Sequence, residues 1–507
     1  MSATGVPVQN AMPGHRGSVM PVLVIAVLFG TAHMLTNGQY GFHRDEWQFL
    51  SDAQHLDWGF VPYPPLTAAL ESLGLKMFGL SLVGLRLFSV LAQVLVILAS
   101  GLMARDLGGG RLAQTFTAIA VGLSPLPMFQ ATEFQYSSFD LLWWVLIAWC
   151  VIRLLRDDEP RWWVAIGILA GLGLQTKYSM AIALAGVWVG VLLTDARRYV
   201  VNRWFWAGGA IALLLFFPNL VWLIRHDFVS YHFLQAIHAR DVHQGRADGF
   251  LRDQFLLNAN LFAAPVWLVG LFAYFNDRRY RMLAWMYVVP LLLFLFAQGR
   301  FYYTCGAYPM LLAMGSVTGE RWLRALRPAW RVGIATLAFT GVFAVGVYAT
   351  LRIVPIATSG PLRDFALKNN ADLREEIGWD ELVAHVAAIR DALPAEQQAN
   401  LGIAVGNYGE YGAIALLGQH YHLPMPITTI NSGWLRGYPQ TPPTTLIVLG
   451  NSRERANLLF TNCRVAGHTS NALGLVNEES GDHPDILVCG PTRKPLSELW
   501  KHGPDFG

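Results

Sequence analysis

Charged residues are scarce in this sequence. Asp, Glu, Lys and Arg make up 14% of its 507 residues, whereas hydrophobic residues make up 54%. An average soluble protein has about 25% charged residues. The mean hydropathy is +0.37. These values exclude an ordinary soluble globular protein.

Several motifs that would indicate a particular ligand or reaction are also absent from the sequence. There is no P-loop, and Gly108-Gly109-Gly110 follows no predicted strand, so nucleotide binding has no support. No Cys/His spacing resembles a zinc site, and no basic cluster with interleaved aromatics indicates nucleic acid as a partner. No internal repeat is present. No cofactor is evident, and the sequence leaves a divalent metal open.

Long apolar runs are abundant instead. A helix needs roughly 20 apolar residues to cross the bilayer core. On that criterion the sequence predicts a polytopic α-helical membrane protein with about eleven transmembrane helices. The predicted spans are 19–37, 82–104, 113–130, 139–155, 162–175, 179–194, 205–224, 256–275, 282–298, 302–318 and 332–351.

Arginines set the orientation of these spans. Alternate connections are arginine-rich, for example at Arg153, Arg156 and Arg161, and the positive-inside rule puts them in the cytoplasm. An odd number of spans then leaves the C-terminus outside. We expect a cytoplasmic tail at 1–17, a multi-span membrane domain at 18–351 with a long outer loop at 38–81, and an extracytoplasmic α/β domain at 352–507.

The α/β prediction for the last part rests on periodicity. Asp380–Leu393 and Arg453–Phe460 have helical patterns, and Leu401–Val405 and Thr445–Leu449 have the pattern of short buried strands. Cys463 and Cys489 both lie in this domain. An oxidising compartment favours a disulfide between them, and two separate buried thiols are the alternative.

An acidic pair follows the first span. Charge is expensive near hydrocarbon, so Asp45 and Glu46, at the outer mouth of this span, are functional candidates. The structural alternatives are a solvated loop pair, or a position of Asp45 in the first turn of a short surface helix.

Two cations on the same outer side are candidate phosphate ligands. Lys177, beside Tyr178 in a very short connection, breaks the positive-inside bias. It could neutralise a phosphate at the headgroup level or simply snorkel to the interface. Arg300 offers a fork for phosphate oxygens. Tyr302 and Tyr303 could add hydroxyl groups or serve as an aromatic belt.

The outer loop carries a recognisable set of motifs. These are His43-Arg44-Asp45-Glu46-Trp47, Asp57-Trp58-Gly59 and Tyr63-Pro64-Pro65-Leu66. Together they resemble bacterial glycosyltransferase family 39, which includes the protein O-mannosyltransferase-like and aminoarabinose-transferase-like enzymes of the C-type glycosyltransferase fold. Weaker likenesses continue through Lys177-Tyr178-Ser179, Tyr302-Tyr303 and Gly406-Asn407-Tyr408-Gly409-Glu410.

The resemblance implies an enzyme of the bacterial plasma (inner) membrane, with 18–351 as its catalytic domain and 38–81 as its active-site loop. It would transfer a sugar, with inversion, from a polyprenyl-phosphate donor to an acceptor hydroxyl on a protein, lipid or cell-envelope glycan, on the outer side. Asp45 would be the general base, and Glu46 would orient it or hold the acceptor. The implied donor-binding residues are His43, Arg44, Tyr63, Pro64, Pro65, Lys177, Tyr178, Arg300, Tyr302 and Tyr303, with Asn407, Tyr408 and Glu410 on the acceptor side.

This sequence departs from the family pattern in two ways. The aminoarabinose branch has an acidic-basic pair before its Pro-Pro, where this chain has Pro62-Tyr63. The metal-ligand set of the oligosaccharyltransferase branch is not evident. A multi-span transporter is an alternative, although it usually shows internal repeats. A membrane-anchored extracytoplasmic binding or sensor protein is another, although it would not need so many spans.

Overall fold

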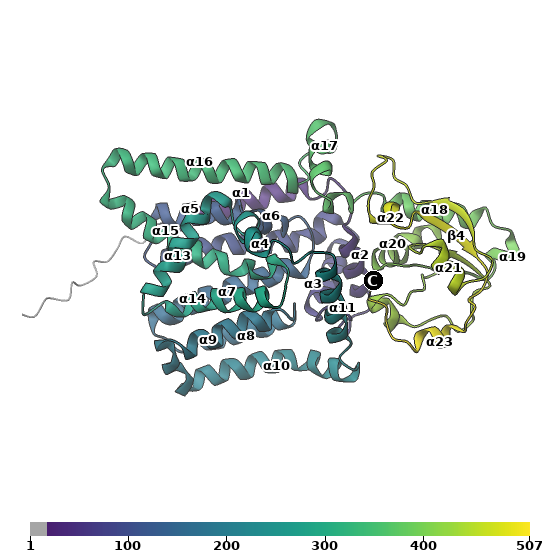
Figure 1. Ribbon diagram of the computed structural model, residues 1–507, viewed down its shortest axis with the longest axis horizontal. Helices are drawn as coiled ribbons and strands as arrows, with labels where there is room; N and C mark the ends of the chain where they lie inside the picture. Colours follow the sequence, from purple (N-terminus) through teal and green to yellow (C-terminus); the bar gives the residue numbers. More distant parts are fainter. Residues whose placement is uncertain (1–17, 507) are drawn as a thin grey trace, which may run out of the picture.

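Residues 20–353 form a bundle of helices that lie side by side along the long axis of the molecule (Figure 1). The computed structural model describes residues 18–506. The expected cytoplasmic tail, 1–17, therefore lies outside the described residues. A smaller α/β domain follows the bundle and lies at one end of it.

Each of the eleven apolar runs predicted from the sequence overlaps a helix of this bundle. The helices are α1 (Met20–Thr36), α4 (Leu82–Asp106), α5 (Arg111–Gly122), α6 (Pro125–Phe129), α7 (Tyr136–Asp157), α8 (Trp162–Leu174), α9 (Met180–Leu192), α10 (Arg203–Arg225), α13 (Ala264–Asn276), α14 (Arg281–Phe296), α15 (Tyr308–Ala325) and α16 (Pro328–Ile353). The run 113–130 is divided between α5 and α6.

Several of these helices are too short to cross a bilayer alone. In the described residues only α4, α7, α10 and α16 are long and apolar enough, and two bent helix pairs raise the number to at most 6. A helix of 13 residues such as α8 is about 20 Å long, against about 30 Å of hydrocarbon. The chain is a polytopic helical membrane protein, and the number of eleven spans stays a prediction.

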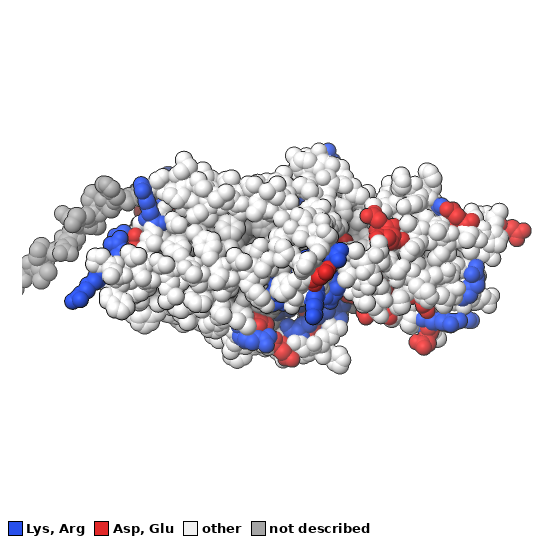
Figure 2. All heavy atoms as spheres, turned by 90° about the horizontal axis from the view of Figure 1, so that it is seen from above, with Lys and Arg blue, Asp and Glu red and all other residues white. Residues whose placement is uncertain are grey.

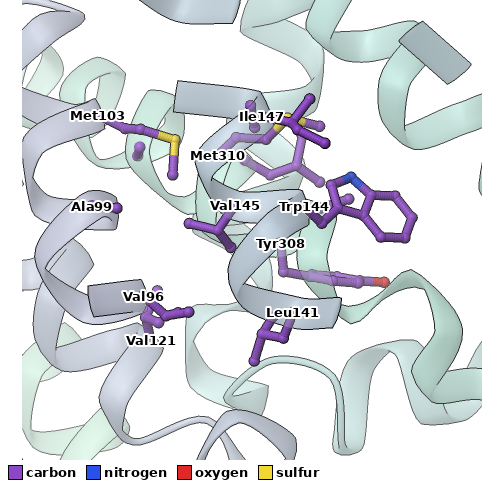
Figure 3. Close-up of a cluster of buried hydrophobic side chains, with 14 of the residues drawn as sticks. Val96, Ala99, Met103, Val121, Leu141, Trp144, Val145, Ile147, Tyr308 and Met310 are labelled. Atoms are coloured by element: carbon purple, nitrogen blue, oxygen red, sulfur yellow. The ribbon is translucent and has the colours of Figure 1, made fainter. Parts of the chain in front are cut away.

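The centre of the bundle is a core of buried apolar side chains from α4, α5, α7 and α15. Figure 3 shows Val96 and Met103 of α4 facing Val145 of α7, with Tyr308 and Met310 of α15 beside them. All five side chains are buried. The face of the bundle seen in Figure 2 carries almost no charge between its arginine-bearing far end and the junction with the α/β domain, as a bilayer-facing surface requires.

Four short helices lie at the end of the bundle that meets the α/β domain. They are α2 (Arg44–Ala53), α3 (Leu66–Phe78), α11 (Val229–His243) and α12 (Phe250–Leu256). In Figure 1, α3 and α11 run across the direction of the long helices. This layer places the loop 38–81 between the bundle and the α/β domain.

The α/β domain is built on a four-stranded mixed sheet. Its strands are β1 (Leu401–Ala404), β2 (Thr445–Val448), β3 (Arg464–His468) and β4 (Asp485–Cys489), in the order β1-β2-β4-β3. β1 and β2 are parallel, and β4 is antiparallel to both β2 and β3. The helices from residue 360 onward are α17 (Gly360–Asn369), α18 (Trp379–Asp391), α19 (Ala395–Gln398), α20 (Tyr408–Leu417), α21 (Arg453–Leu459), α22 (Glu478–Gly481) and α23 (Leu496–Trp500).

The two helices and two strands that periodicity predicted in this domain are confirmed as α18, α21, β1 and β2. A disulfide joins Cys463, just before β3, to Cys489 at the end of β4. It ties together two neighbouring strands of the sheet.

The two domains meet where α2 packs against α20. A Cβ atom on Gly412 would come within 2.1 Å of the Trp47 carbonyl oxygen, so only glycine permits this approach. A partly buried ion pair adds to the contact, because Arg436 Nη2 lies 2.5 Å from Asp52 Oδ1. The α/β domain is therefore docked directly onto the loop 38–81.

Candidate active site

Asp45 lies in the first turn of α2, which begins with a reciprocal capping arrangement. The imidazole Nδ1 of His43 accepts a hydrogen bond from the Asp45 backbone N–H at 3.2 Å. The Glu46 carboxylate in turn accepts from the His43 N–H at 2.7 Å. Both orphan donors are satisfied, as in a capping box. The short helix thus holds Asp45 in a defined position.

Glu46 turns inward, away from solvent. Its carboxylate accepts from Arg86 Nε at 2.9 Å and Nη2 at 2.7 Å, and from the Phe134 N–H at 2.7 Å. Arg86 is fully buried and also donates to the Asn37 and Gly41 carbonyl oxygens. These bonds use both Glu46 oxygens. Glu46 therefore supports the start of α2, and direct contact with an acceptor stays a prediction.

The α/β domain contributes a partner to Asp45. The Tyr408 hydroxyl, at the start of α20, donates to Asp45 Oδ1 at 2.9 Å. Burial, followed by the charge of Asp45, raises the pKa of Tyr408, so the phenol stays a donor at neutral pH. The Arg44 guanidinium lies over the Tyr408 ring, 5.3 Å from its centroid, and pairs with Glu478. Asp45 itself is partly exposed.

The other two acceptor-side candidates serve the same helix. The Asn407 side chain caps α20 by accepting from the Glu410 N–H at 2.8 Å. Glu410 is 1% exposed, and its carboxylate accepts from the Gly406 N–H at 3.2 Å. Burial raises the pKa of Glu410 to about 7. Both residues fix the position of Tyr408, and their contact with an acceptor stays a prediction.

Lys177 lies in a cage of three tyrosine rings. Its Nζ atom is 5.0 Å from the centroid of Tyr136, 4.9 Å from that of Tyr302 and 4.6 Å from that of Tyr303. No carboxylate lies within ion-pair distance of this ammonium group in the described chain. Ring faces attract a cation but carry no net charge. The cage therefore keeps a net positive charge that a phosphate can neutralise.

Arg300 lies beside this cage, and part of its guanidinium group is already hydrogen-bonded. Its Nε and Nη2 donate to the two carboxylate oxygens of Asp241 on α11, at 2.6 and 2.8 Å. Its Nη1 lies 3.5 Å from the Tyr302 hydroxyl. The fork facing Asp241 is thus occupied, and the Nη1 edge faces the tyrosine cage.

The carboxylate of Asp45 and the two cations, Lys177 and Arg300, lie around the same residue, Tyr136. Tyr136, a wall of the Lys177 cage, is within electrostatic reach of Asp45, Tyr302, Arg300 and Tyr408. The structure therefore brings together a partly exposed carboxylate and two cations from segments far apart in the sequence. Such a pairing suits a reaction that removes a proton at one end and releases an anion at the other.

Four other predicted donor ligands have different surroundings. Tyr63, Pro64 and Pro65 are buried, and the Tyr63 hydroxyl donates to Asp52 at 2.7 Å. The Tyr178 hydroxyl lies 3.4 Å from Ser230 Oγ on α11 rather than in the lysine cage. These burial and hydrogen-bond contacts stabilise the fold around the site, and a donor-binding role for the four residues stays a prediction.

Sequence reasoning missed three residues that complete this arrangement. Arg86 was counted within the apolar run 82–104, Tyr136 stands at the start of a span, and Asp241 lies in a long connection. Arg86 could have been found from the sequence, because an arginine inside a predicted span needs a partner. In residues 18–506 no group of three or more His, Cys, Asp or Glu could hold a metal ion.

Comparison with known proteins gives independent evidence about the family that this chain resembles. A family model described as dolichyl-phosphate-mannose-protein mannosyltransferase matches residues 62–222, which include Lys177 but not Asp45. A lipid A galacturonosyltransferase from Rhizobium johnstonii is 24% identical over 384 residues, 73% of this chain and 77% of the relative. A lipopolysaccharide core galacturonosyltransferase from the same organism is 25% identical over 491 residues, 94% of this chain and 85% of the relative.

A solved structure shows the fold. The crystal structure of ArnT from Cupriavidus metallidurans bound to undecaprenyl phosphate matches with a TM-score of 0.55, covering 93% of this chain and 97% of that chain at 14% identity. The chain resembles glycosyltransferase family 39. This family 39-like chain has the helical C-type glycosyltransferase fold and is embedded in a membrane, and the relatives that it resembles are glycosyltransferases.

Proposed function

We propose that this chain is an inverting glycosyltransferase that moves a sugar from a polyprenyl-phosphate donor to an acceptor hydroxyl. The observation that carries the proposal is the convergence of Asp45 with Lys177 and Arg300 around Tyr136. In this proposal the sugar of the donor lies between the base Asp45 and the phosphate-binding cations.

The proposed reaction is a single in-line displacement. Asp45 accepts the proton of the acceptor hydroxyl as its oxygen bonds to the anomeric carbon. The bond from that carbon to the phosphate oxygen breaks on the opposite face, which inverts the centre. The polyprenyl phosphate leaves with the electron pair. Lys177 and the Nη1 edge of Arg300 stabilise its charge, a contribution that is often the largest in such transfers.

The relatives support a lipid-linked donor and a cell-envelope acceptor. The ArnT structure holds undecaprenyl phosphate, and the two rhizobial relatives are named for transfer to lipid A and to the lipopolysaccharide core. We extend these chemistries to this chain as a proposal, with a lipid or glycan hydroxyl as the acceptor and a hexose, pentose or uronic acid as the sugar. A protein hydroxyl is the further possibility that the family model adds.

The proposal includes a location. We place the enzyme in the bacterial plasma membrane, with about eleven spans within 18–351 and with Asp45 and the domain 352–507 outside the cytoplasm. The arginines at the end of the bundle opposite the α/β domain support this orientation through the positive-inside rule.

A transfer assay with Asp45→Asn tests the proposal. The purified chain is given labelled polyprenyl-phosphate sugars (mannose, arabinose, aminoarabinose and galacturonate) with an envelope lipid extract. We expect the variant to lose transfer while keeping its folding and membrane insertion, because an amide keeps the shape but cannot take the proton.

Asp57→Asn is the matched control. It changes an exposed carboxylate of the same loop, which within residues 18–506 accepts hydrogen bonds from Trp58 N and Trp222 Nε1, and we expect it to retain activity. Turnover by Asp45→Asn close to that of the parent would contradict the assignment of the base.

A further inference from the structure

The end of the bundle opposite the α/β domain contains a pocket lined by arginines. Its volume is about 120 Å³, and it lies between the C-terminal end of α9 and the turn that joins α13 to α14. The lining residues are Leu193, Thr194, Asp195, Arg197, Arg278 and Arg281. Three cations therefore face one carboxylate, and the pocket has an excess of positive charge.

The guanidinium groups of two of these arginines are available to bind a ligand. Arg197 and Arg278 are exposed, and within residues 18–506 neither guanidinium group has a hydrogen bond or ion pair to the protein. Arg281 uses only its Nε, which donates to the Phe275 carbonyl oxygen at 2.8 Å. The neighbouring Arg198, by contrast, pairs with Asp158 at 2.6 Å. The pocket thus offers free N–H forks of the geometry that matches phosphate oxygens.

Apolar side chains border the pocket. Leu192 is 55% exposed, Leu193 57% and Val201 92%. Leu193 lines the pocket itself, Leu192 is the last residue of α9, and Val201 is the last residue of the 3-10 helix Asp195–Val201 that follows it. Exposed leucine and valine next to free arginines match the boundary between lipid headgroups and acyl chains. A freely soluble phosphate would use the arginines but not this apolar border.

We propose that this pocket binds the phosphate of an anionic phospholipid at the membrane surface opposite the α/β domain. Arg197 and Arg278 hold the phosphate oxygens, Arg281 adds charge at the base, and the acyl chains lie along Leu192 and Leu193. The site is separate from the Lys177 cage, at the other end of the bundle. It does not depend on the proposed transfer reaction.

Lipid retention on the full-length chain tests the proposal. The parent and Arg197→Ala/Arg278→Ala, purified in a neutral detergent, are titrated with dioleoyl-phosphatidylglycerol, and bound lipid is counted by native mass spectrometry. We expect the double variant to bind this lipid about tenfold to a hundredfold more weakly, because two charge-assisted contacts are lost. Dioleoyl-phosphatidylcholine should bind weakly to both proteins.

Arg327→Ala/Arg331→Ala is the matched control. It removes the same charge from two exposed arginines at the same end, at the start of α16, outside the pocket. We expect this control to bind phosphatidylglycerol like the parent. Equal loss in both double variants would show a diffuse charge effect and overturn the site, as would parent-like binding by Arg197→Ala/Arg278→Ala.

Two further measurements separate the remaining outcomes. Arg197→Lys/Arg278→Lys keeps the charge but loses the forks, so we expect intermediate binding in a chain whose thermal unfolding matches the parent. Inorganic phosphate at millimolar concentration should displace little lipid. Complete displacement by inorganic phosphate would identify a free-phosphate site and overturn the lipid assignment.

Discussion

At the scale of single residues, Lys177 differs from an ordinary interfacial lysine because three aromatic rings surround its ammonium group and no carboxylate of residues 18–506 lies within ion-pair distance. We predict that Lys177→Ala and Arg300→Ala each weaken polyprenyl-phosphate binding, whatever the sugar. A lost charge-assisted contact is worth roughly 1.5–3 kcal/mol, or about tenfold to a hundredfold in affinity. Binding titrations with polyprenyl phosphate measure the loss.

Lys76→Ala is the control for this pair. It removes an exposed lysine on α3 from the same loop region and should bind as the parent does. If Lys177→Ala and Arg300→Ala also bind as the parent does, the phosphate pocket lies elsewhere and Lys177 simply snorkels to the interface.

Glu410 gives a prediction about pH. Burial raises its pKa from 4.5 to about 7 in the folded chain, so the folded state holds this proton more tightly than the unfolded state. Its contribution to stability is therefore present below pH 4.5 and is lost as pH rises through 7, by at most about 3 kcal/mol. Thermal unfolding between pH 4.5 and 8 should show Glu410→Gln gaining on the parent as pH rises. A constant difference across this range would contradict the prediction.

The sequence predicted the charged candidates better than their partners. Asp45 and Lys177 could be found from the sequence because each places a charge next to a predicted span. A charge near hydrocarbon is energetically costly and therefore indicates a functional role. Tyr136 and Asp241 were not, since a tyrosine at a helix end and an aspartate in a loop are common. The contact of Asp45 with Tyr408 joins residues 363 positions apart, and no local pattern encodes such a distance.

At the scale of elements, the contact of α2 with α20 depends on a missing side chain. We predict that Gly412→Ala weakens this docking, because the added Cβ would meet the Trp47 carbonyl oxygen at 2.1 Å. Overpacking of this kind typically costs about 1–3 kcal/mol. The melting temperature should fall, and transfer should fall with it because Tyr408 moves away from Asp45.

Gly319→Ala is the control for this substitution. Its added Cβ meets nothing within 4 Å on α15, and alanine favours a helix over glycine, so its melting temperature should hold or rise. An unchanged melting temperature for Gly412→Ala would mean that the two helices can move apart at little cost.

Elements were predictable where one periodicity ran long enough. The apolar runs and the strands at 401–405 and 445–449 coincide with helices and strands of the structure. The bends were not predictable: α9 turns by 100° into the 3-10 helix that follows it. An apolar run looks the same whether it is one straight helix or two short ones, because composition does not record where the chain turns.

At the scale of the whole molecule, the side of the membrane on which the α/β domain lies defines the orientation of the chain. We predict that residues after about 352 lie outside the cytoplasm and that the disulfide between Cys463 and Cys489 forms there. Closing a loop of this length could contribute roughly 3 kcal/mol by restricting the unfolded chain. Membrane-impermeant thiol labelling of intact cells, with and without reductant, tests both statements.

The expected labelling pattern is specific. The two cysteines should react only after reduction, and the buried Cys150 and Cys305 should stay unlabelled in folded protein. Reaction of Cys463 and Cys489 without reductant would contradict the bridge. A C-terminal reporter active only in the cytoplasm would contradict the topology.

The net positive charge of the Lys177 cage has a consequence for turnover. A sugar-phosphate diester carries one negative charge, whereas the polyprenyl phosphate monoester left behind carries about −1.5 to −2 at neutral pH. The same cations should therefore hold the spent lipid more tightly than the donor. We expect release of the lipid carrier to limit the steady-state rate, and its accumulation in the membrane to slow the enzyme before the acceptor runs out.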